Sequence, residues 1–367
     1  MRTEEVRARM QLANPILSLA VLAAAALAVT FLATPLASLL GRRMGAWDQP
    51  DELGIHAEPV PRTGGIAIAL GLFIGVQAAW SQSTDIATSR LVVAAAVGSV
   101  LVFIVGLLDD LREIKPYAKA IGLVAAAVVG QLIAPHAVLS GFERLDFVIG
   151  LVVLMFGANA LNLLDGMDGL ASGVTVIACL GFGAISYLEN HLLLTAQAAM
   201  VAGAAMGFWL NNHPPAKIFM GDCGSLMLGF ILAGMALKTS SYGLNHMLAA
   251  VAVLSIPLLD TGLAMLRRLL AGADVFSGDR KHLYDLLFAR YHSVWRVNII
   301  MYLMATAFAG IGVAILYLPW PTALGLVLAP WLGLLGWMIH LGMFLREREA
   351  EKKRQADNES ENDEYRD

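Results

Sequence analysis

The stretch Asn159-Ala-Leu-Asn162-Leu-Leu-Asp165-Gly-Met-Asp168-Gly-Leu170 places two amides and two carboxylates at intervals of three residues. It follows directly on an apolar run over 147–158. On one straight helix the four groups would drift around the axis, because residues three apart share a face only approximately. The glycines predict instead that the helix ends near Asp165 and that the chain turns, bringing Asp168 back. Carboxylates at a helix C-terminus meet the negative end of the macrodipole, so they need a positive partner, and a divalent metal is the first candidate.

The rest of the chain is too apolar for a soluble domain. Of its 367 residues, 58% are hydrophobic and 15% are charged, which predicts an all-α polytopic membrane protein. The net charge of −4 gives no support to a nucleic-acid partner. The two cysteines, Cys179 and Cys223, predict no disulfide framework, and packing as small apolar side chains is the simpler interpretation.

Hydropathy predicts about eleven transmembrane helices. They fall at roughly 14–40, 63–80, 91–108, 117–134, 147–164, 169–188, 192–210, 224–238, 246–266, 297–318 and 321–345. Together they form one transmembrane domain, 14–345, between an N-terminal tail, 1–13, and a charged tail, 346–367. The first apolar run is too long for the core of a cleaved signal peptide.

The lysines and arginines predict the orientation. Of these 25 residues, 19 lie on the side reached at the ends of the odd-numbered spans. The positive-inside rule places that side in the cytoplasm, with the N-terminus outside and the C-terminus inside. Arg2, Arg7 and Arg9 argue in the opposite direction. The predicted cytoplasmic loops are 41–63, 109–116, 165–168, 211–223 and 267–296, and they hold almost all of the polar chemistry.

Two of these loops combine acidic and basic residues. Asp109 and Asp110 end an apolar helix shortly before Lys115 and Lys119. Carboxylates that hold a metal beside cations that hold phosphate suit a metal–phosphate site, although a solvated helix end is the alternative. In 211–223, Asp222 stands between Gly221 and Gly224, where a helix N-terminus can receive phosphate. The alternative is that Asp222 caps that helix.

Asp260 lies inside a predicted span, and Arg267 lies two turns later on the same face. A buried ion pair between them is therefore an alternative to a catalytic role for Asp260. The long loop 267–296 carries basic and histidine residues. It is expected either to close over a sugar nucleotide or to hold anionic lipid.

Six motifs, read in order, resemble the polyprenyl-phosphate N-acetylhexosamine-1-phosphate transferases, a family of the glycosyltransferase family 4 type. They are Pro-Arg-x-Gly-Gly at 61–65, Asp109-Asp110, the stretch 159–169, Phe219-Met-Gly-Asp-x-Gly-Ser at 219–225, Pro257-x-x-Asp260 and Asp279-x-x-His282. The resemblance covers about 48–291 and is strongest to the bacterial undecaprenyl-phosphate N-acetylglucosamine-1-phosphate transferases. One such motif is weak, but six in order on one predicted side are specific.

The resemblance implies about ten or eleven transmembrane helices in the bacterial inner membrane and a cytoplasmic active site. It implies transfer of a sugar-1-phosphate, with N-acetylglucosamine-1-phosphate as the first choice, from a UDP-sugar to undecaprenyl phosphate with release of UMP. This is the first membrane step of a cell-envelope polysaccharide such as lipopolysaccharide. The implied cofactor is Mg²⁺, with Mn²⁺ as a substitute, and a homodimer is left open.

The resemblance implies three roles for residues of this chain: catalysis, metal binding and substrate binding. The expected catalytic residues are Asp109, Asp110, Asp165, Asp168 and His282. The expected metal ligands are Asp222 and, more weakly, Asn159. The expected substrate-binding residues are His56, Arg62, Lys115, Lys119, Asn159, Asn162, Lys217, Phe219, Asp279 and Arg280.

The chain departs from the family where the usual His-x-His-His reads His282-Leu-Tyr284-Asp285. This change keeps three alternatives open: another UDP-N-acetylhexosamine donor, a muramoyl-pentapeptide donor, or an inactive relative that binds lipid phosphate. The chain lacks the His-rich signature of the muramoyl branch, which favours a simpler donor. An ion-coupled transporter predicts inverted repeats and mid-membrane polar groups, and a prenyltransferase predicts Asp-rich motifs at four-residue spacing. The sequence shows neither pattern.

Overall fold

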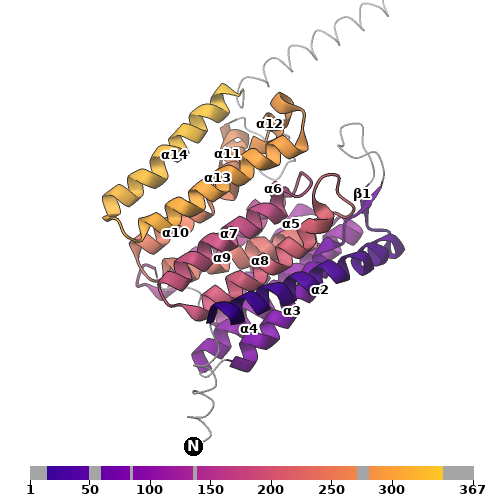
Figure 1. The fold of residues 1–367 in the computed structure, drawn as a ribbon, viewed down its shortest axis with the longest axis horizontal. Helices are drawn as coiled ribbons and strands as arrows, with labels where there is room; N and C mark the ends of the chain where they lie inside the picture. Colours follow the sequence, from indigo (N-terminus) through magenta and orange to yellow (C-terminus); the bar gives the residue numbers. More distant parts are fainter. Residues whose placement is uncertain (1–14, 49–58, 83–85, 135–138, 271–280, 342–367) are drawn as a thin grey trace, which may run out of the picture.

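The computed structural model describes residues 15–48, 59–82, 86–134, 139–270 and 281–341. Within these ranges the chain forms a bundle of long helices with one short strand pair (Figure 1). The elements are, in order, α2 (Pro15–Met44), β1 (Trp47–Asp48), β2 (Val60–Pro61), α3 (Gly64–Gln82), α4 (Ile86–Arg112), α5 (Pro116–Ile133), α6 (Glu143–Leu164), α7 (Leu170–Leu188), α8 (Leu192–Asn212), α9 (Gly221–Ser240), α10 (Leu244–Val253), α11 (Ser255–Leu270), α12 (Leu283–Tyr291), α13 (Val294–Ile315) and α14 (Trp320–His340). The predicted tails, 1–13 and 346–367, lie outside the described residues.

The helices are those of a polytopic membrane protein. In the described part of the chain, nine helices are long and apolar enough to cross a membrane, and the bent pair α10–α11 adds a tenth candidate. In α3, the segment Gly64–Ile74 is a shorter apolar helix. The predicted all-α polytopic class is confirmed, whereas the count of eleven spans and the orientation of the termini stay predictions.

Helix α9 lies at the centre of the bundle. In its most apolar window 89% of the residues are buried, against 11% in α2. Small residues allow its neighbours to approach closely: a Cβ on Gly229 would lie 2.4 Å from the carbonyl oxygen of Gly157 on α6. A Cβ on Gly106 of α4 would lie 2.5 Å from the backbone of Asp222. Such small-residue contacts are how helices pack inside a membrane, and they bring α4 and α6 against the N-terminal half of α9.

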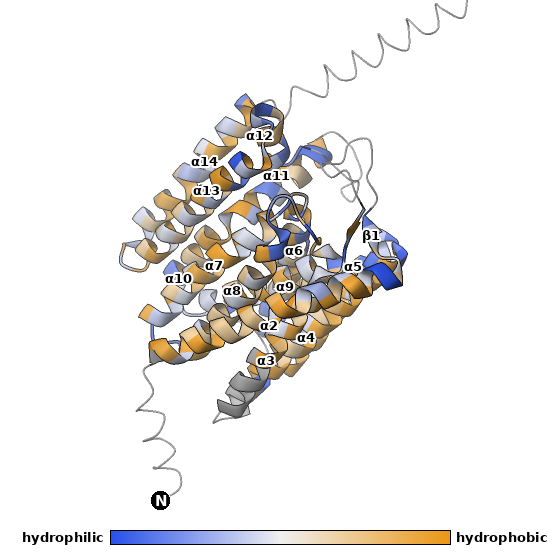
Figure 2. Cartoon of the chain, turned by 45° about the vertical axis from the view of Figure 1, so that its right-hand side comes forward, coloured by the Kyte–Doolittle hydropathy of each residue, from blue (hydrophilic) through white to orange (hydrophobic). Residues whose placement is uncertain are grey.

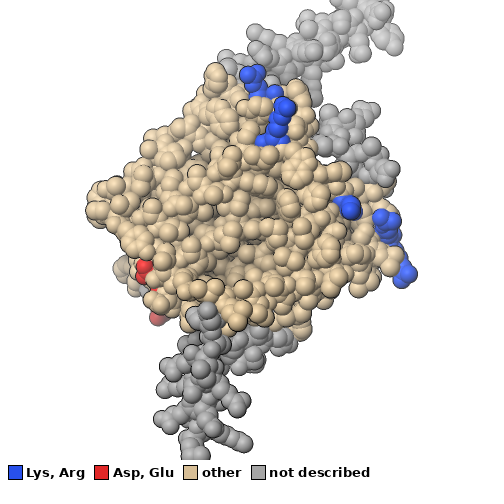
Figure 3. All heavy atoms as spheres, viewed as in Figure 1, with Lys and Arg blue, Asp and Glu red and all other residues tan. Residues whose placement is uncertain are grey.

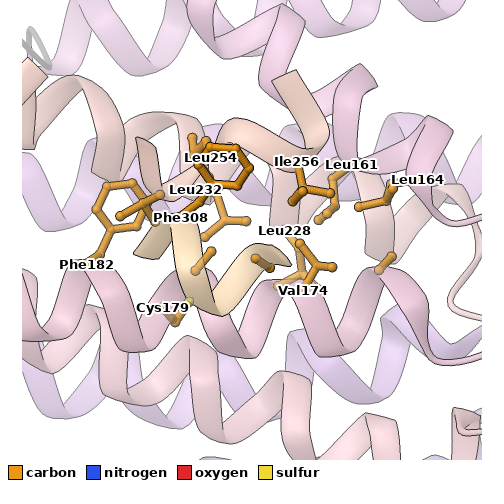
Figure 4. Close-up of a cluster of buried hydrophobic side chains, with 14 of the residues drawn as sticks. Leu161, Leu164, Val174, Cys179, Phe182, Leu228, Leu232, Leu254, Ile256 and Phe308 are labelled. Atoms are coloured by element: carbon orange, nitrogen blue, oxygen red, sulfur yellow. The ribbon is translucent and has the colours of Figure 1, made fainter. Parts of the chain in front are cut away.

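A large apolar core fills the space between α6, α7, α9 and the bent pair (Figure 4). Leu161 and Leu164 of α6 face Leu228 of α9, and Phe182 of α7 lies near Phe308 of α13. Every one of these side chains is at most 5% exposed. The core therefore fixes the C-terminal end of α6, which is where the acidic stretch begins.

The predicted span 246–266 is not one straight helix, because the chain breaks there into α10 and α11, which meet at 76°. Pro257 explains the break, since it has no N–H to donate and its ring clashes with the carbonyl four residues earlier. The hydroxyl of Ser255 donates to the Val251 carbonyl (3.1 Å) and accepts from the indole N–H of Trp331 on α14 (2.8 Å). The break is thus both hydrogen-bonded and buried.

Polar residues gather at one end of the bundle. Figure 2 shows hydrophilic residues concentrated around β1, α11 and α12, while apolar residues dominate the flanks of α2 and α4. In Figure 3 the visible lysines and arginines lie at that same end, and the visible acidic side chains lie at the opposite end. We call the first end the acidic-site end, because it carries Asp109, Asp165 and Asp222.

Candidate active site

The loop 61–65 pairs with the segment that leads into α9. The Phe219 amide donates to the Pro61 carbonyl (2.9 Å), and the amides of Gly64 and Gly65 donate to the carbonyls of Phe219 (2.9 Å) and Met220 (2.8 Å). Gly65 is needed for this approach, since a Cβ there would lie 2.3 Å from the backbone nitrogen of Gly224. Two motifs that are about 155 positions apart therefore form one backbone unit at the start of α9.

The side chain of Asp110, on α4, caps the N-terminus of α9. Its Oδ1 accepts from the Asp222 amide (2.8 Å) and its Oδ2 from the Cys223 amide (2.9 Å). The side chain is only 7% exposed. A helix N-terminus leaves its first amides without partners, so a carboxylate that accepts two of them stabilises the start of the helix. The alternative that Asp222 caps this helix is wrong, because Asp110 fills that position.

The side chain of Asp222 is consequently available to other helices. Its Oδ1 accepts from the Asn162 amide group of α6 (2.9 Å), and its Oδ2 contacts the Lys119 ammonium of α5. The same ammonium lies 3.0 Å from Oδ2 of Asp109 on α4, and Asn162 also donates to Ser225 Oγ (3.0 Å). We call Asp109, Lys119, Asn162 and Asp222 the four-helix cluster.

The four-helix cluster is mostly buried but still reaches solvent. The charged side chains of Asp109, Lys119 and Asp222 are 16%, 18% and 14% exposed. The Asp109 side chain is also held by the backbone just after α4, since its Oδ1 accepts from the Ile114 amide (2.8 Å). Two carboxylates therefore converge on one cation in a site of low dielectric, where electrostatic interactions are stronger than in water.

The chain turns sharply after α6, as predicted from the glycines. Helix α6 ends at Leu164, Asp165 is its C-cap residue, and Gly169 has φ +77° immediately before α7. Oδ2 of Asp168 accepts from the Ala216 amide (2.9 Å), which ties the turn to the loop 213–217. The Asn298 amide group donates to the Asp168 carbonyl (2.7 Å) and thereby adds α13 to the same turn.

Asp165 stands in an electrostatically unfavourable position for an anion. Burial, followed by the negative charges of Asp222 and Asp110, raises the pKa of the Asp165 carboxyl well above its usual value, and Arg62 acts in the opposite direction. The C-terminal end of the α6 macrodipole adds to this effect. Burial, the neighbouring carboxylates and the helix C-terminus are the reasons for expecting a positive group near Asp165.

A second buried unit joins α11 to α12. Oδ2 of Asp260 lies 2.7 Å from Nδ1 of His282, and Oδ1 accepts from the Leu283 amide (2.6 Å). Both side chains are about 2% exposed. A carboxylate on Nδ1 keeps the proton on that nitrogen and fixes the orientation of the ring. The alternative of a buried ion pair between Asp260 and Arg267 is not what holds this carboxylate; Arg267 donates to the Lys281 carbonyl (3.0 Å).

Comparison with known proteins identifies the family. Residues 91–240 match the sequence profile of glycosyl transferase family 4. The chain is 30% identical over 287 residues to the probable undecaprenyl-phosphate N-acetylglucosaminyl 1-phosphate transferase of Bacillus subtilis (strain 168), covering 75% of this chain and 79% of the relative. The chain belongs to glycosyl transferase family 4.

Two further relatives have similar levels of identity to this family 4 chain. The decaprenyl-phosphate N-acetylglucosaminephosphotransferase of Mycobacterium tuberculosis (strain ATCC 25618 / H37Rv) is 33% identical over 325 residues, which are 79% of this chain and 80% of the relative. A phospho-N-acetylmuramoyl-pentapeptide-transferase of Mycobacterium sp. (strain JLS) is 31% identical over 359 residues, 82% and 97% of the two chains. The predicted resemblance is therefore confirmed.

The family 4 profile covers the whole four-helix cluster, whereas His282 and Asp260 lie beyond its end. Two predicted site residues, Asn159 and Arg62, make side-chain contacts outside the four-helix cluster. Asn159 donates to the Met155 carbonyl (2.9 Å) on its own helix, and Asn162 takes the contact with Asp222. Arg62 lies 3.7 Å from Asp48. The predicted metal role of Asn159 stays a prediction.

Of the remaining predicted substrate-binding residues, the structure describes Lys115, Lys217 and Phe219. Lys115 is the residue before α5, with its ammonium 5.9 Å from the centre of the Tyr117 ring. The side chain of Lys217 is exposed and that of Phe219 is half-buried. His56, Asp279 and Arg280 lie outside the described residues. Their roles in substrate binding stay predictions.

Sequence reasoning did not assign Ser225 or Asn212 to the site. Asn212 accepts from the Gly169 amide and from Ser172 Oγ (3.1 Å each), and it donates to the Ile218 carbonyl (3.0 Å). It therefore joins the turn after α6 to the loop before α9. The only sequence signal for Asn212 was the pair Asn211-Asn212 at the end of an apolar helix, and such a pair is not specific.

Proposed function

We propose that this chain transfers a sugar-1-phosphate from a UDP-sugar to undecaprenyl phosphate and releases UMP. N-acetylglucosamine-1-phosphate is the first choice of transferred group. The observation that carries the proposal is the four-helix cluster, which gathers two carboxylates, an amide and an ammonium from four helices at one end of the bundle. Two of the relatives are named as N-acetylglucosamine-phosphate transferases to polyprenyl phosphates, which supports the same class of reaction.

In the proposed reaction, an oxygen of the lipid phosphate attacks the β-phosphorus of the UDP-sugar. The bond from that phosphorus to the bridging oxygen breaks, UMP leaves with the oxygen, and a lipid diphosphate sugar remains. Both reactants are anionic, so mutual repulsion is the first obstacle, and Lys119 supplies positive charge at the cluster. The lipid phosphate is largely ionised near neutral pH, since the second pKa of a phosphate monoester is about 6, so positioning and electrostatics outweigh proton abstraction.

The donor atoms of the cluster suit Mg²⁺, which prefers one or two carboxylates and shares its remaining positions with phosphate oxygens. Asp222 and Asp109 would hold the ion, because both of their Oδ2 atoms already converge on a cation, the Lys119 ammonium. When bound, the ion would neutralise phosphate charge, and Mn²⁺ has similar ligand preferences. Among the described residues no three His, Cys, Asp or Glu side chains form a metal cluster.

The proposal places the acidic-site end at the cytoplasmic face of the bacterial inner membrane. The basic side chains visible at that end follow the positive-inside rule. A UDP-sugar is water-soluble while the acceptor is a membrane lipid, so a site at the membrane surface serves both. The eleven spans, with the N-terminus outside and the C-terminus inside, are part of this proposal.

The test is UMP release by the purified protein with undecaprenyl phosphate and separate UDP-N-acetylglucosamine, UDP-N-acetylgalactosamine and UDP-N-acetylmuramoyl-pentapeptide donors. Each donor is supplied with Mg²⁺, with Mn²⁺ or with EDTA. Asp222→Asn is the test variant, and Asp146→Asn, which removes a carboxylate at the start of α6 away from the cluster, is the matched control. Release that depends on a divalent ion and is lost only in Asp222→Asn supports the proposal. No release with any donor, from folded wild-type protein, overturns it.

A further inference from the structure

Tyr284 closes the α12 segment onto the end of α6. Its hydroxyl donates to the carbonyl of Leu163 (3.2 Å). The last carbonyls of a helix have no partner within the helix, and α6 ends one residue after Leu163. The Tyr284 hydroxyl therefore satisfies a group that the α6 terminus leaves open. This bond falls between Asn162, which contacts Asp222, and Asp165.

The ring of Tyr284 also supports His282. The two rings lie parallel, with an interplanar angle of 4° and 5.4 Å between their centres. On its other side, His282 is held by the carboxylate of Asp260 at 2.7 Å. The carboxylate of Asp285 accepts from the His282 amide (3.1 Å). His282 is thus fixed through its ring, its Nδ1 atom and its backbone.

The missing side chain of Gly166 leaves the space that the Tyr284 side chain occupies. A Cβ at this position would lie 2.2 Å from the Tyr284 hydroxyl oxygen and 2.8 Å from Cζ of the ring. Gly166 is otherwise exposed, so the tyrosine is the specific neighbour that excludes a side chain there. The absence of a Cβ at 166 and the presence of a hydroxyl at 284 therefore depend on each other.

We infer that Tyr284 is a positioning residue, which latches His282 and α12 to the acid-bearing C-terminal end of α6. The inference rests on the proposed transferase function. Tyr284 and Asp285 stand where this family usually has histidines, and here they act through stacking, a hydroxyl bond and helix capping. The latch holds His282 and the start of α12 in place through Tyr284 and Asp285.

The test is a double-mutant cycle with Gly166→Ala and Tyr284→Phe. Tyr284→Phe removes only the hydroxyl, so we expect kcat to fall about fivefold, as for loss of one neutral hydrogen bond, with KM for the donor unchanged. Gly166→Ala is expected to lower kcat more than tenfold, because the new methyl group collides with the hydroxyl. In the double variant the shortest contact, 2.2 Å to the hydroxyl oxygen, is gone and the contact with Cζ at 2.8 Å remains, so the collision is smaller and kcat should exceed that of Gly166→Ala alone.

Gly325→Ala and Tyr317→Phe are the matched controls, because a Cβ at 325 meets nothing within 4 Å and Tyr317 is 69% exposed. Wild-type activity in Gly166→Ala, or strictly multiplicative effects in the double variant, would overturn the latch. The same cycle is measured by thermal unfolding and by hydrogen exchange of 283–291, which need no substrate. If the wild-type chain releases no UMP, the proposed function fails, and coupling or its absence in these two measurements still decides the latch.

Discussion

Asp110→Asn separates a structural role for this carboxylate from a chemical one. In the wild-type chain both oxygens accept backbone amides at the start of α9, at 2.8 and 2.9 Å. The substitution removes the charge and replaces one oxygen by an NH₂ group, so one amide loses its acceptor and faces a donor. A hydrogen bond to a charged group contributes about 1.5–3 kcal/mol, and an unsatisfied buried amide costs about 1–3 kcal/mol. We therefore expect a loss of roughly 2–4 kcal/mol in stability.

The assay is thermal unfolding of the purified protein in detergent micelles, with UMP release measured in parallel. The expected result is a midpoint several degrees lower, together with reduced activity, because Asp222 loses its backbone anchor. Asp109→Asn is the control from the same helix: it keeps an oxygen for the Ile114 amide and removes charge beside Lys119. That variant should unfold near the wild-type temperature and lose activity. An Asp110→Asn protein that is inactive yet as stable as wild type would refute the capping role.

Three further predictions follow from other contacts. Gly229→Val should destabilise the bundle by about 1–3 kcal/mol or more, because its Cβ would lie 2.4 Å from the Gly157 carbonyl; thermal unfolding against a Gly333→Ala control checks this. Lys119→Met should lower kcat at least tenfold by removing the cation between two carboxylates, and unchanged turnover would contradict its role. Burial lowers the pKa of His191 below its ordinary value of 6.5. The folded protein therefore binds that proton more weakly than the unfolded chain, so stability is full above about pH 6.5 and declines as the pH falls further. His191→Phe, which keeps the stacking on Tyr242 at 3.7 Å, should flatten this decline in unfolding midpoints between pH 7 and pH 5.

The end of α6 was predictable because its determinants are local. Glycines at 166 and 169 beside carboxylates at 165 and 168 indicate a helix C-terminus and a turn, and the structure confirms both. The all-α membrane class was equally accessible, since apolar runs of span length depend on composition alone. The confirmed family rested on the order of several short motifs, which needs no knowledge of the fold.

The partners of individual carboxylates were not predictable, because they depend on contacts between distant helices. Asp110 caps α9 only because Gly106 lets α4 approach the backbone of Asp222. For Asp260 the helical spacing offered only Arg267 as a partner, whereas the structure places His282, at the start of α12, against this carboxylate. The break after α10 was missed because the run is continuously apolar, although Pro257 gave the local signal for it.

The central claim is that the chain transfers a sugar together with its phosphate. The most direct test uses UDP-N-acetylglucosamine labelled with ³²P at the β-phosphate, undecaprenyl phosphate and the purified wild-type protein, followed by separation of lipid from water-soluble products. The account predicts that the label enters the lipid fraction in equal amount to the UMP released, and that Asp222→Asn abolishes both. Label recovered in UDP, with unlabelled sugar on the lipid, would contradict it.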